Sequence, residues 1–170
     1  MVTLFYAVMA LVGLERLAEL VVARRNAAWS FAHGGVEHGA GHYPFMVVLH
    51  TGFLFGCVAE VALLHRPFTP WIGWPALAVC VAAQAIRWWV ITTLGPRWNT
   101  RVIVIPGLAP VSGGPFRWLR HPNYLAVIAE GIALPMVHGA WITALTFTVL
   151  NAALLRTRIA TEDAALGRST

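Results

Sequence analysis

The sequence predicts an all-α integral membrane protein with about five transmembrane helices. Of its 170 residues, 58% are hydrophobic and only 11% are charged, whereas soluble domains carry roughly a quarter of charged residues. The apolar residues gather in long runs, and ten of the twelve arginines lie between these runs rather than within them. No internal repeat divides the chain. We therefore expect one membrane domain over residues 1–170, with lipid as the solvent of its helices.

Five apolar runs are candidate membrane helices: residues 2–22, 43–64, 71–94, 123–137 and 140–155. A helix needs about 20 apolar residues to span a bilayer, and fewer where it tilts or the bilayer thins. The first run is not typical of a cleaved signal peptide, because no basic residue precedes it and Glu15 and Arg16 follow its apolar part. The last two runs are short and are joined by His138 and Gly139, which predicts a tight helical hairpin.

The arginines predict the orientation. If the N-terminus lies outside, the inner segments hold nine arginines and the outer loops hold only Arg66, which follows the positive-inside rule. The nine are Arg24, Arg25, Arg97, Arg101, Arg117, Arg120, Arg156, Arg158 and Arg168. We therefore expect an integral protein of the cytoplasmic (inner) membrane with a cytoplasmic C-terminus. Since most of the cations lie between apolar runs, the net charge of +5 indicates a lipid bilayer as partner and no nucleic acid.

Several polar residues lie within the predicted spans: Glu15, Arg16, Glu19, His50, Glu60, Arg87 and Glu130. A charge at membrane depth costs about 2.5–3.5 kcal/mol on insertion scales, so it normally faces a partner or a cavity. Glu15 and Glu19 are expected on one helical face beside Arg16, and Glu60 is expected to pair with Arg87. Interhelical ion pairs and a polar pocket for a substrate head group are both compatible with this pattern.

Residues 26–42 form a segment rich in glycine and histidine, which predicts a flexible loop and a mobile lid over a membrane-facing pocket. His33, His38 and His42 are spaced by five and four residues, which does not match a zinc site. Cys57 and Cys80 lie within apolar runs and have no metal-binding spacing. No metal is expected.

Residues 113–124 form a turn-rich, cationic and aromatic segment between two apolar runs. Its glycines and prolines exclude a continuous helix. Pro122 is typical of a first helical turn, which puts His121 at the positive end of the next helix. Arginine and histidine donors beside Trp118 and Tyr124 suit a ligand with a carboxylate and a flat ring. The alternative is a connector that only sets the topology.

The sequence Arg120-His121-Pro122-Asn123-Tyr124 resembles the isoprenylcysteine carboxyl methyltransferase family. The resemblance begins near residues 98–101, includes the lead-in at 114–119 and resumes at 158–163. The whole chain looks like the short bacterial branch whose members O-methylate alkylpyrones or alkylresorcinols. Matches of the N-terminal half to that branch are at Glu15-Arg16, Glu19-Leu20, Ala23-Arg24-Arg25-Asn26 and His42-Tyr43-Pro44.

This resemblance implies an S-adenosylmethionine-dependent O-methyltransferase acting on a small membrane-embedded lipid. Residues 95–170 would be the cofactor-binding half, and residues 1–94 would shape the lipid side with three spans. The cofactor-binding residues implied are Gly114, Pro115, Arg120, His121, Pro122, Asn123, Tyr124 and Glu162. The catalytic candidates are Arg158, Glu162 and Arg101, and the substrate-binding candidates are His50, Arg87, Asn99 and Trp98.

The chemistry implied is an in-line methyl transfer, with the acceptor oxygen about 3–3.5 Å from the methyl carbon. It requires no metal. A carboxylate or an acidic enol is already anionic at pH 7, so Arg158 or Arg101 would orient it. A phenol would need a base such as Glu162 or His50. Both kinds of acceptor stay open. A prenylated protein is disfavoured, because the longer tail of eukaryotic members is missing after Leu166 and Gly167.

Two other functions remain possible on the sequence alone. Membrane sterol reductases carry a similar helix and bind NADPH, but they place glycine and an acid directly after the tyrosine. Here Leu125 follows Tyr124, and the first acid is Glu130. A non-catalytic scaffold or a small transporter fits the hydropathy, although no pair of related halves with broken helices is present.

Overall fold

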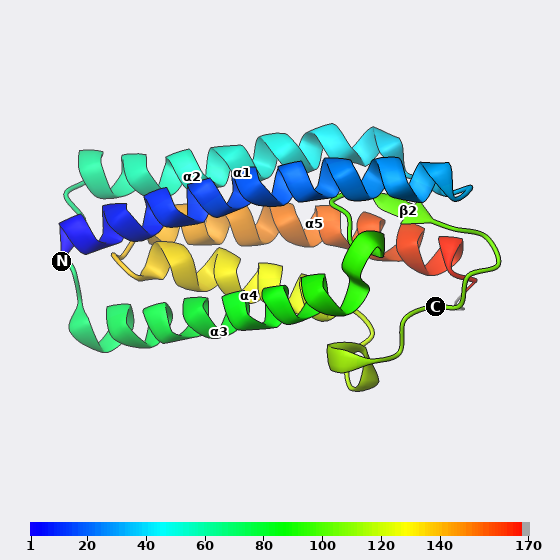
Figure 1. Ribbon diagram of the computed structural model, residues 1–170. Coiled ribbons are helices and arrows are strands. Elements are labelled where there is room, and N and C mark those ends of the chain that lie inside the picture. Colours follow the sequence, from blue (N-terminus) through cyan, green and yellow to red (C-terminus); the bar gives the residue numbers. More distant parts are fainter. Residues whose placement is uncertain (168–170) are drawn as a thin grey trace.

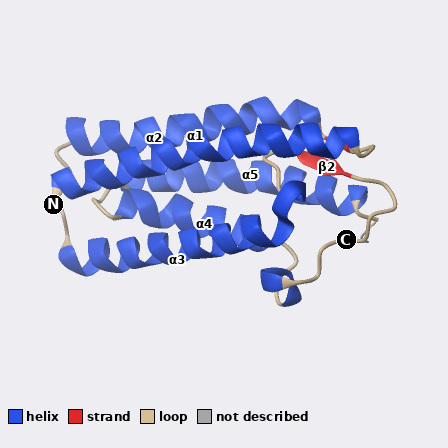
Figure 2. Cartoon of the chain, in the orientation of Figure 1, coloured by secondary structure: helices blue, strands red, loops and turns tan. Residues whose placement is uncertain are grey.

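The computed structural model describes residues 1–167 and contains five long α-helices in that part of the chain. These are α1 (Val2–Ala32), α2 (Tyr43–Leu63), α3 (Pro70–Leu94), α4 (Pro122–Met136) and α5 (Trp141–Ala165). They lie side by side in one elongated bundle, with the start of α1 and the end of α5 at opposite ends of it (Figure 1). Figure 2 shows how little of the chain is strand. The predicted all-α class is confirmed.

Proline and glycine residues set several of the helix ends. Pro70 and Pro122 are the first residues of α3 and α4, where a missing N–H costs nothing. Gly139 has a φ of 71° in the turn that joins α4 to α5, and the Ala140 amide donates to the Pro135 carbonyl at 2.9 Å. This is the predicted helical hairpin. α5 continues ten residues beyond the predicted span, to Ala165.

Apolar side chains cover the outside of the bundle. Those at least 61% exposed on the helices are Leu11, Leu14, Leu17, Phe45, Val48, Phe55, Leu63, Trp71, Val81, Leu145 and Val149. The interior instead holds Glu19, Glu60 and Arg87, each 7% exposed. An apolar surface of this extent around a polar interior indicates a lipid surrounding. Two helical segments, Ala40–Leu63 and Pro70–Arg97, are long and apolar enough to cross a membrane. Five crossings stay a prediction.

The predicted pairing of Glu60 with Arg87 is wrong. Glu60 accepts hydrogen bonds from the backbone amides of Ile142 at 3.2 Å and Thr143 at 2.7 Å, and it pairs with Arg66 at 2.9 Å. The first turn of α5 leaves amide donors unpaired at the positive end of the helix, and the carboxylate of α2 satisfies them. This contact ties α2 to α5.

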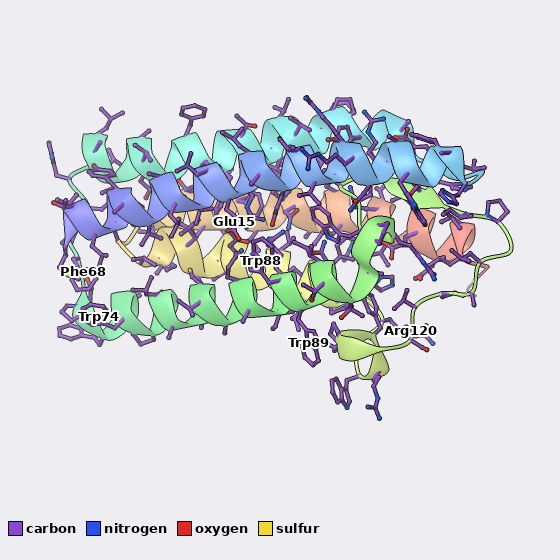
Figure 3. All side chains as sticks on the ribbon, in the orientation of Figure 1. Glu15, Phe68, Trp74, Trp88, Trp89 and Arg120 are labelled. Atoms are coloured by element: carbon purple, nitrogen blue, oxygen red, sulfur yellow. The ribbon has the colours of Figure 1, made fainter. Side chains whose placement is uncertain are left out.

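Arg87 belongs to a different group, which we call the interhelical ion cluster: Glu15, Arg16, Glu19, Gln84, Arg87 and Glu130. Arg87 lies 2.5 Å from Glu130, and Arg16 contacts Glu19 at 2.8 Å and Glu15 at 3.1 Å. The prediction that the α1 acids lie together beside Arg16 is confirmed. Trp88 donates to Glu15 at 2.8 Å across the space between α1 and α3 (Figure 3). The cluster therefore joins α1, α3 and α4.

Residues 26–42 are not one loop, and this prediction is wrong. α1 runs on to Ala32, and β1 (Val36–His38) pairs antiparallel with β2 (Val102–Val104). A short 3₁₀ helix, η1 (Ala40–His42), leads into α2. Strand pairing satisfies backbone groups that a free loop would leave to water. Within residues 1–167 no group of three metal-binding side chains comes together.

The two ends of the bundle differ in charge. The alternating helix directions bring the predicted inner arginines to the end that carries the β1–β2 sheet, while Arg66 follows α2 at the other end. Arg168, the ninth in that set, lies outside the described residues. We call the arginine-rich end the sheet end.

Candidate functional site

A pocket of about 170 Å³ lies at the sheet end, where α1 and α3 finish and α4 begins. Its wall also includes β2 and two loop segments: the one around η2 (Gly95–Arg97) and the one that leads from Ile105 to η3 (Gly114–Arg117). The polar residues that line it are Ser30, Arg97, Asn99, Arg101, Arg120, His121, Asn123, Tyr124, Arg158 and Glu162. The apolar part includes Val90, Leu94, Leu108 and Phe116. The pocket thus combines a charged face with an apolar one.

Helix geometry places the charged face. α4 begins at Pro122 with His121 as its N-cap, as predicted, so Tyr124 lies in its first turn. Arg158 and Glu162 are four residues apart near the end of α5, and therefore share one face of that helix. The start of α4 and the end of α5 meet at the sheet end.

Tyr124 connects the start of α4 to the end of α5. Its hydroxyl donates to Oε2 of Glu162 at 2.5 Å and accepts from Nε of Arg158 at 3.1 Å. Tyr124 and Arg158 are each 6% exposed. A buried hydroxyl between a carboxylate and a guanidinium has both its donor and its acceptor capacity used. We call Tyr124, Arg158 and Glu162 the polar triad.

His121 extends the triad to a second acid. Its Nδ1 lies 3.6 Å from Oε1 of Glu162, and its Nε2 lies 3.2 Å from Oδ1 of Asp163. Contact with Glu162 raises the pKa of His121 above 6.5 despite partial burial, and the negative charge of Asp163 adds to this. Burial by itself raises the pKa of Glu162, but contacts with His121 and Tyr124 outweigh it and hold that pKa below 4.5. At neutral pH Glu162 is a carboxylate.

Arg158 also ties the triad to α2 and to the loop before β2. It donates to the Thr100 carbonyl at 2.5 Å and contacts the Met46 sulfur at 2.9 Å. The Tyr43 hydroxyl lies 3.4 Å from the Thr100 hydroxyl. The guanidinium therefore has a fixed position, with its weakest contact at the thioether.

Arg101, Asn99 and Trp98 line the pocket as well, but two of them also hold the loop in place. Asn99 donates to the Ala23 carbonyl at 3.2 Å, and Trp98 is 4% exposed in a cluster with Ala23 and Val90. Arg101 is more open. It pairs with Glu37 of β1 at 3.2 Å, and its guanidinium lies 5.0 Å from the centre of the Tyr43 ring.

The structure brings most of the predicted site residues together and leaves four outside the pocket wall. Gly114 packs on Thr93 of α3, and Pro115 is buried beside it. His50 bonds to the Met46 carbonyl and meets the edge of Phe147, while Arg87 belongs to the interhelical ion cluster. The functional roles suggested for all of these residues stay predictions.

Several residues that shape the pocket were not predicted. Asn26 donates to the carbonyls of Gly95 and Trp98, at 3.2 and 2.8 Å, and so fixes the loop after α3. Arg97 donates to the Ala109 carbonyl at 2.8 Å. This bond holds in place the segment between Ile105 and η3, which forms part of the pocket wall. Asn26 directly follows Arg24 and Arg25 in the sequence. Two adjacent arginines indicate the orientation of a membrane helix, and they do not point to Asn26 as a residue that anchors a loop.

The wall includes an arginine and an amide oxygen that have no partner among the described residues. The Arg120 guanidinium is exposed and makes no hydrogen bond or ion pair there, and it extends from the loop at the sheet end (Figure 3). The Oδ1 atom of Asn123 is buried and unpaired. A free guanidinium suits a carboxylate, and a buried amide oxygen suits an N–H or O–H donor. The wall thus fits a zwitterionic ligand with a flat apolar part.

Comparison with known proteins gives a family match and two relatives. Residues 76–168, which include the pocket wall from Val90 onward, match the isoprenylcysteine carboxyl methyltransferase (ICMT) family. The chain is 38% identical to YpbQ of Bacillus subtilis over 164 residues, which are 96% of either chain. It is 28% identical to a Haemophilus influenzae protein over 154 residues, which are 89% of this chain and 88% of that one. Neither relative's name states an activity.

Proposed function

Because the chain belongs to the isoprenylcysteine carboxyl methyltransferase family, we propose that it is an S-adenosylmethionine-dependent O-methyltransferase that acts on a small amphipathic lipid. The family match gives a membrane methyltransferase. The cofactor and the kind of acceptor are our inference from the pocket. The main support for this inference is the pocket at the sheet end of the lipid-facing bundle. Its wall contains both unpaired polar groups and the hydrogen-bonded polar triad.

The residues of the wall fit the cofactor. Arg120 would pair with its carboxylate, and Oδ1 of Asn123 would accept from one of its amino groups. Phe116, Leu108 and Val90 offer an apolar surface for the adenine ring. When bound, S-adenosylmethionine supplies an already activated methyl group, so no metal is needed.

The polar triad orients the acceptor in this proposal. Arg158 is held by Tyr124 and Thr100, while its contact with the Met46 thioether is weak and readily exchanged for an acceptor oxygen. A guanidinium that is already fixed binds an enolate or carboxylate without further ordering of its own side chain. Glu162 is ionised at neutral pH and takes up the proton of a phenolic acceptor if one is used.

A lipid acceptor follows from the position of the site. The pocket lies at one end of a bundle whose outer surface is apolar, so a hydrophobic tail stays in the bilayer while the polar head reaches the triad. We place the sheet end in the cytoplasm, because it gathers the arginines. Alkylpyrones and alkylresorcinols, the acceptors of the short bacterial branch, have such a head and tail.

Methyl transfer tests this proposal directly. Purified protein in detergent or nanodiscs would be given methyl-labelled S-adenosylmethionine with a 4-hydroxy-6-alkyl-2-pyrone, an alkylresorcinol or an S-prenylcysteine. We expect label in the pyrone or the resorcinol, and none with the Glu162→Ala variant. Transfer to S-prenylcysteine alone would exclude the polyketide-lipid assignment and keep the methyltransferase. Absence of transfer to all three, together with absence of cofactor binding, would contradict the proposal itself.

A further inference from the structure

A second cavity, of about 260 Å³, lies along α5 and against Ile128 of α4. We call it the α5 cavity. Its other lining residues are Phe147, Thr148, Asn151, Ala152, Leu155, Arg156 and Ile159. None of them lines the pocket at the sheet end. Most of this wall is apolar, and α5 lies in the lipid-facing bundle, which suits a hydrocarbon chain.

Asn151 is the polar residue inside this apolar wall. It is 3% exposed, its Oδ1 atom is buried, and its carboxamide makes no hydrogen bond with any described residue. The neighbouring Thr148 hydroxyl donates to the Ala144 carbonyl at 2.7 Å, so its proton is already used. Buried side-chain amides nearly always have a partner. The Nδ2 group is also without a partner among the described residues, so it is a donor for a ligand with a hydrogen-bond acceptor at that depth.

Arg156 lines the same cavity one to two turns nearer the sheet end. It is exposed, and no carboxylate of residues 1–167 lies within ion-pair distance of it. Five residues of helix separate it from Asn151, which corresponds to about 7.5 Å along the axis. This is a distance that a glycerol backbone spans between a phosphate and an acyl ester carbonyl.

We propose that the α5 cavity binds one acyl chain of an anionic bilayer phospholipid. The chain lies between Ile128 and Phe147, an ester carbonyl accepts from Nδ2 of Asn151, and the phosphate pairs with Arg156. A bilayer lipid, rather than the methyl acceptor, is the occupant, because the cavity shares no residue with the polar triad. This site is independent of the proposed catalysis.

Native mass spectrometry of the full chain tests the proposal by counting retained lipids. Detergent-purified protein would be titrated with phosphatidylglycerol or with phosphatidylcholine of the same acyl chains. We expect one tightly retained phosphatidylglycerol per chain, favoured over phosphatidylcholine by roughly fivefold, since a basic residue near the surface contributes that much attraction to anionic lipid. Arg156→Gln should lose this preference, and Ala152→Phe, which fills the cavity, should retain neither lipid.

The matched control is Arg24→Gln. Arg24 is an exposed arginine of the sheet end on α1, so this change removes the same charge away from the cavity. It should leave the retained lipid as in the unaltered protein. Because Arg156 is exposed, we expect Arg156→Gln to fold, so it provides a second test if Ala152→Phe does not fold. Unchanged retention in Arg156→Gln and Ala152→Phe would overturn the proposal. Displacement of phosphatidylglycerol by an alkylpyrone would also overturn it and assign the cavity to the methyl acceptor.

Discussion

The Tyr124 hydroxyl donates a 2.5 Å hydrogen bond to Glu162 and so joins the first turn of α4 to the last turns of α5. The same hydroxyl accepts from Arg158. One phenol therefore sets the distance between a carboxylate and a guanidinium that the sequence places on one helix. The pocket at the sheet end is ordered through this residue.

Tyr124→Phe should destabilise the protein and weaken methyl transfer. The change keeps the ring and removes two hydrogen bonds to charged groups in a buried site, which should cost about 1.5–3 kcal/mol. Thermal unfolding in detergent measures this loss. The matched control is Tyr43→Phe, whose hydroxyl has only a 3.4 Å contact with Thr100, and which should cost less. Equal losses in the two variants would contradict a special role for Tyr124.

Arg158→Lys should lower the methyl-transfer rate by about 100-fold while the protein remains folded. Lysine keeps the charge but does not reproduce the planar fork that reaches Tyr124, Thr100 and the acceptor together. Steady-state rates with the best acceptor, at saturating cofactor, measure the effect. Arg156→Lys, two residues away on a different face, is the control and should keep its rate. A similar fall in both variants would indicate a general effect of charge at this end.

The pairing of His121 with its two acids predicts how stability depends on pH. The pKa of His121 is raised above 6.5 in the fold, so its contribution is complete below 6.5 and is lost as the pH rises through the raised value. The pKa of Glu162 is lowered, so its contribution is present above 4.5 and is lost as the pH falls through the lowered value. The pair is therefore most stabilising between about pH 4.5 and 6.5.

The difference in melting temperature between the unaltered protein and His121→Gln isolates this contribution. It should be largest near pH 6 and shrink as the pH is raised above 6.5, since the charge of His121 is then lost. Other titrating groups cancel in the difference. A difference that stays constant from pH 6 to pH 9 would show that His121 is not ionised in the fold.

The helix directions predict opposite exposure of the two bundle ends. In a Cys57→Ala, Cys80→Ala background, Leu108→Cys at the sheet end should react with a membrane-impermeant maleimide only in inverted vesicles. Leu64→Cys, at the end of α2, should react only in intact cells. Both positions are exposed, at 44% and 53%. Labelling of both from one side would exclude five crossings with a cytoplasmic sheet end.

The positions of α2, α3 and α4 were predictable from the sequence, because apolar runs and Pro or Gly boundaries are local signals, whereas α1 and α5 each continue ten residues beyond the predicted runs. α2, α3 and α4 begin and end within one residue of the predicted runs. The β1–β2 pairing was not predictable, because its strands are three residues long and about 65 residues apart. Neither strand has enough length for an alternating pattern to be recognised.

The site was predictable from its motif but not from periodicity. The resemblance at 120–124 and 158–163 pointed to residues that the fold does bring together, including Tyr124, Arg158 and Glu162. It did not point to Thr100, whose backbone carbonyl holds Arg158, because a carbonyl has no sequence signature. The partner of Glu60 was predicted wrongly for a similar reason: its main partners are backbone amides of α5.

Cofactor binding tests the central claim most directly. Calorimetric titration of the detergent-purified protein with S-adenosylhomocysteine, and separately with NADPH, compares the methyltransferase with the reductase that the motif at 120–124 also resembles. We predict that S-adenosylhomocysteine alone binds, and that binding is lost in His121→Ala but kept in His33→Ala, which changes a histidine outside the pocket wall. Binding of NADPH alone, or of neither ligand to folded protein, would contradict the account.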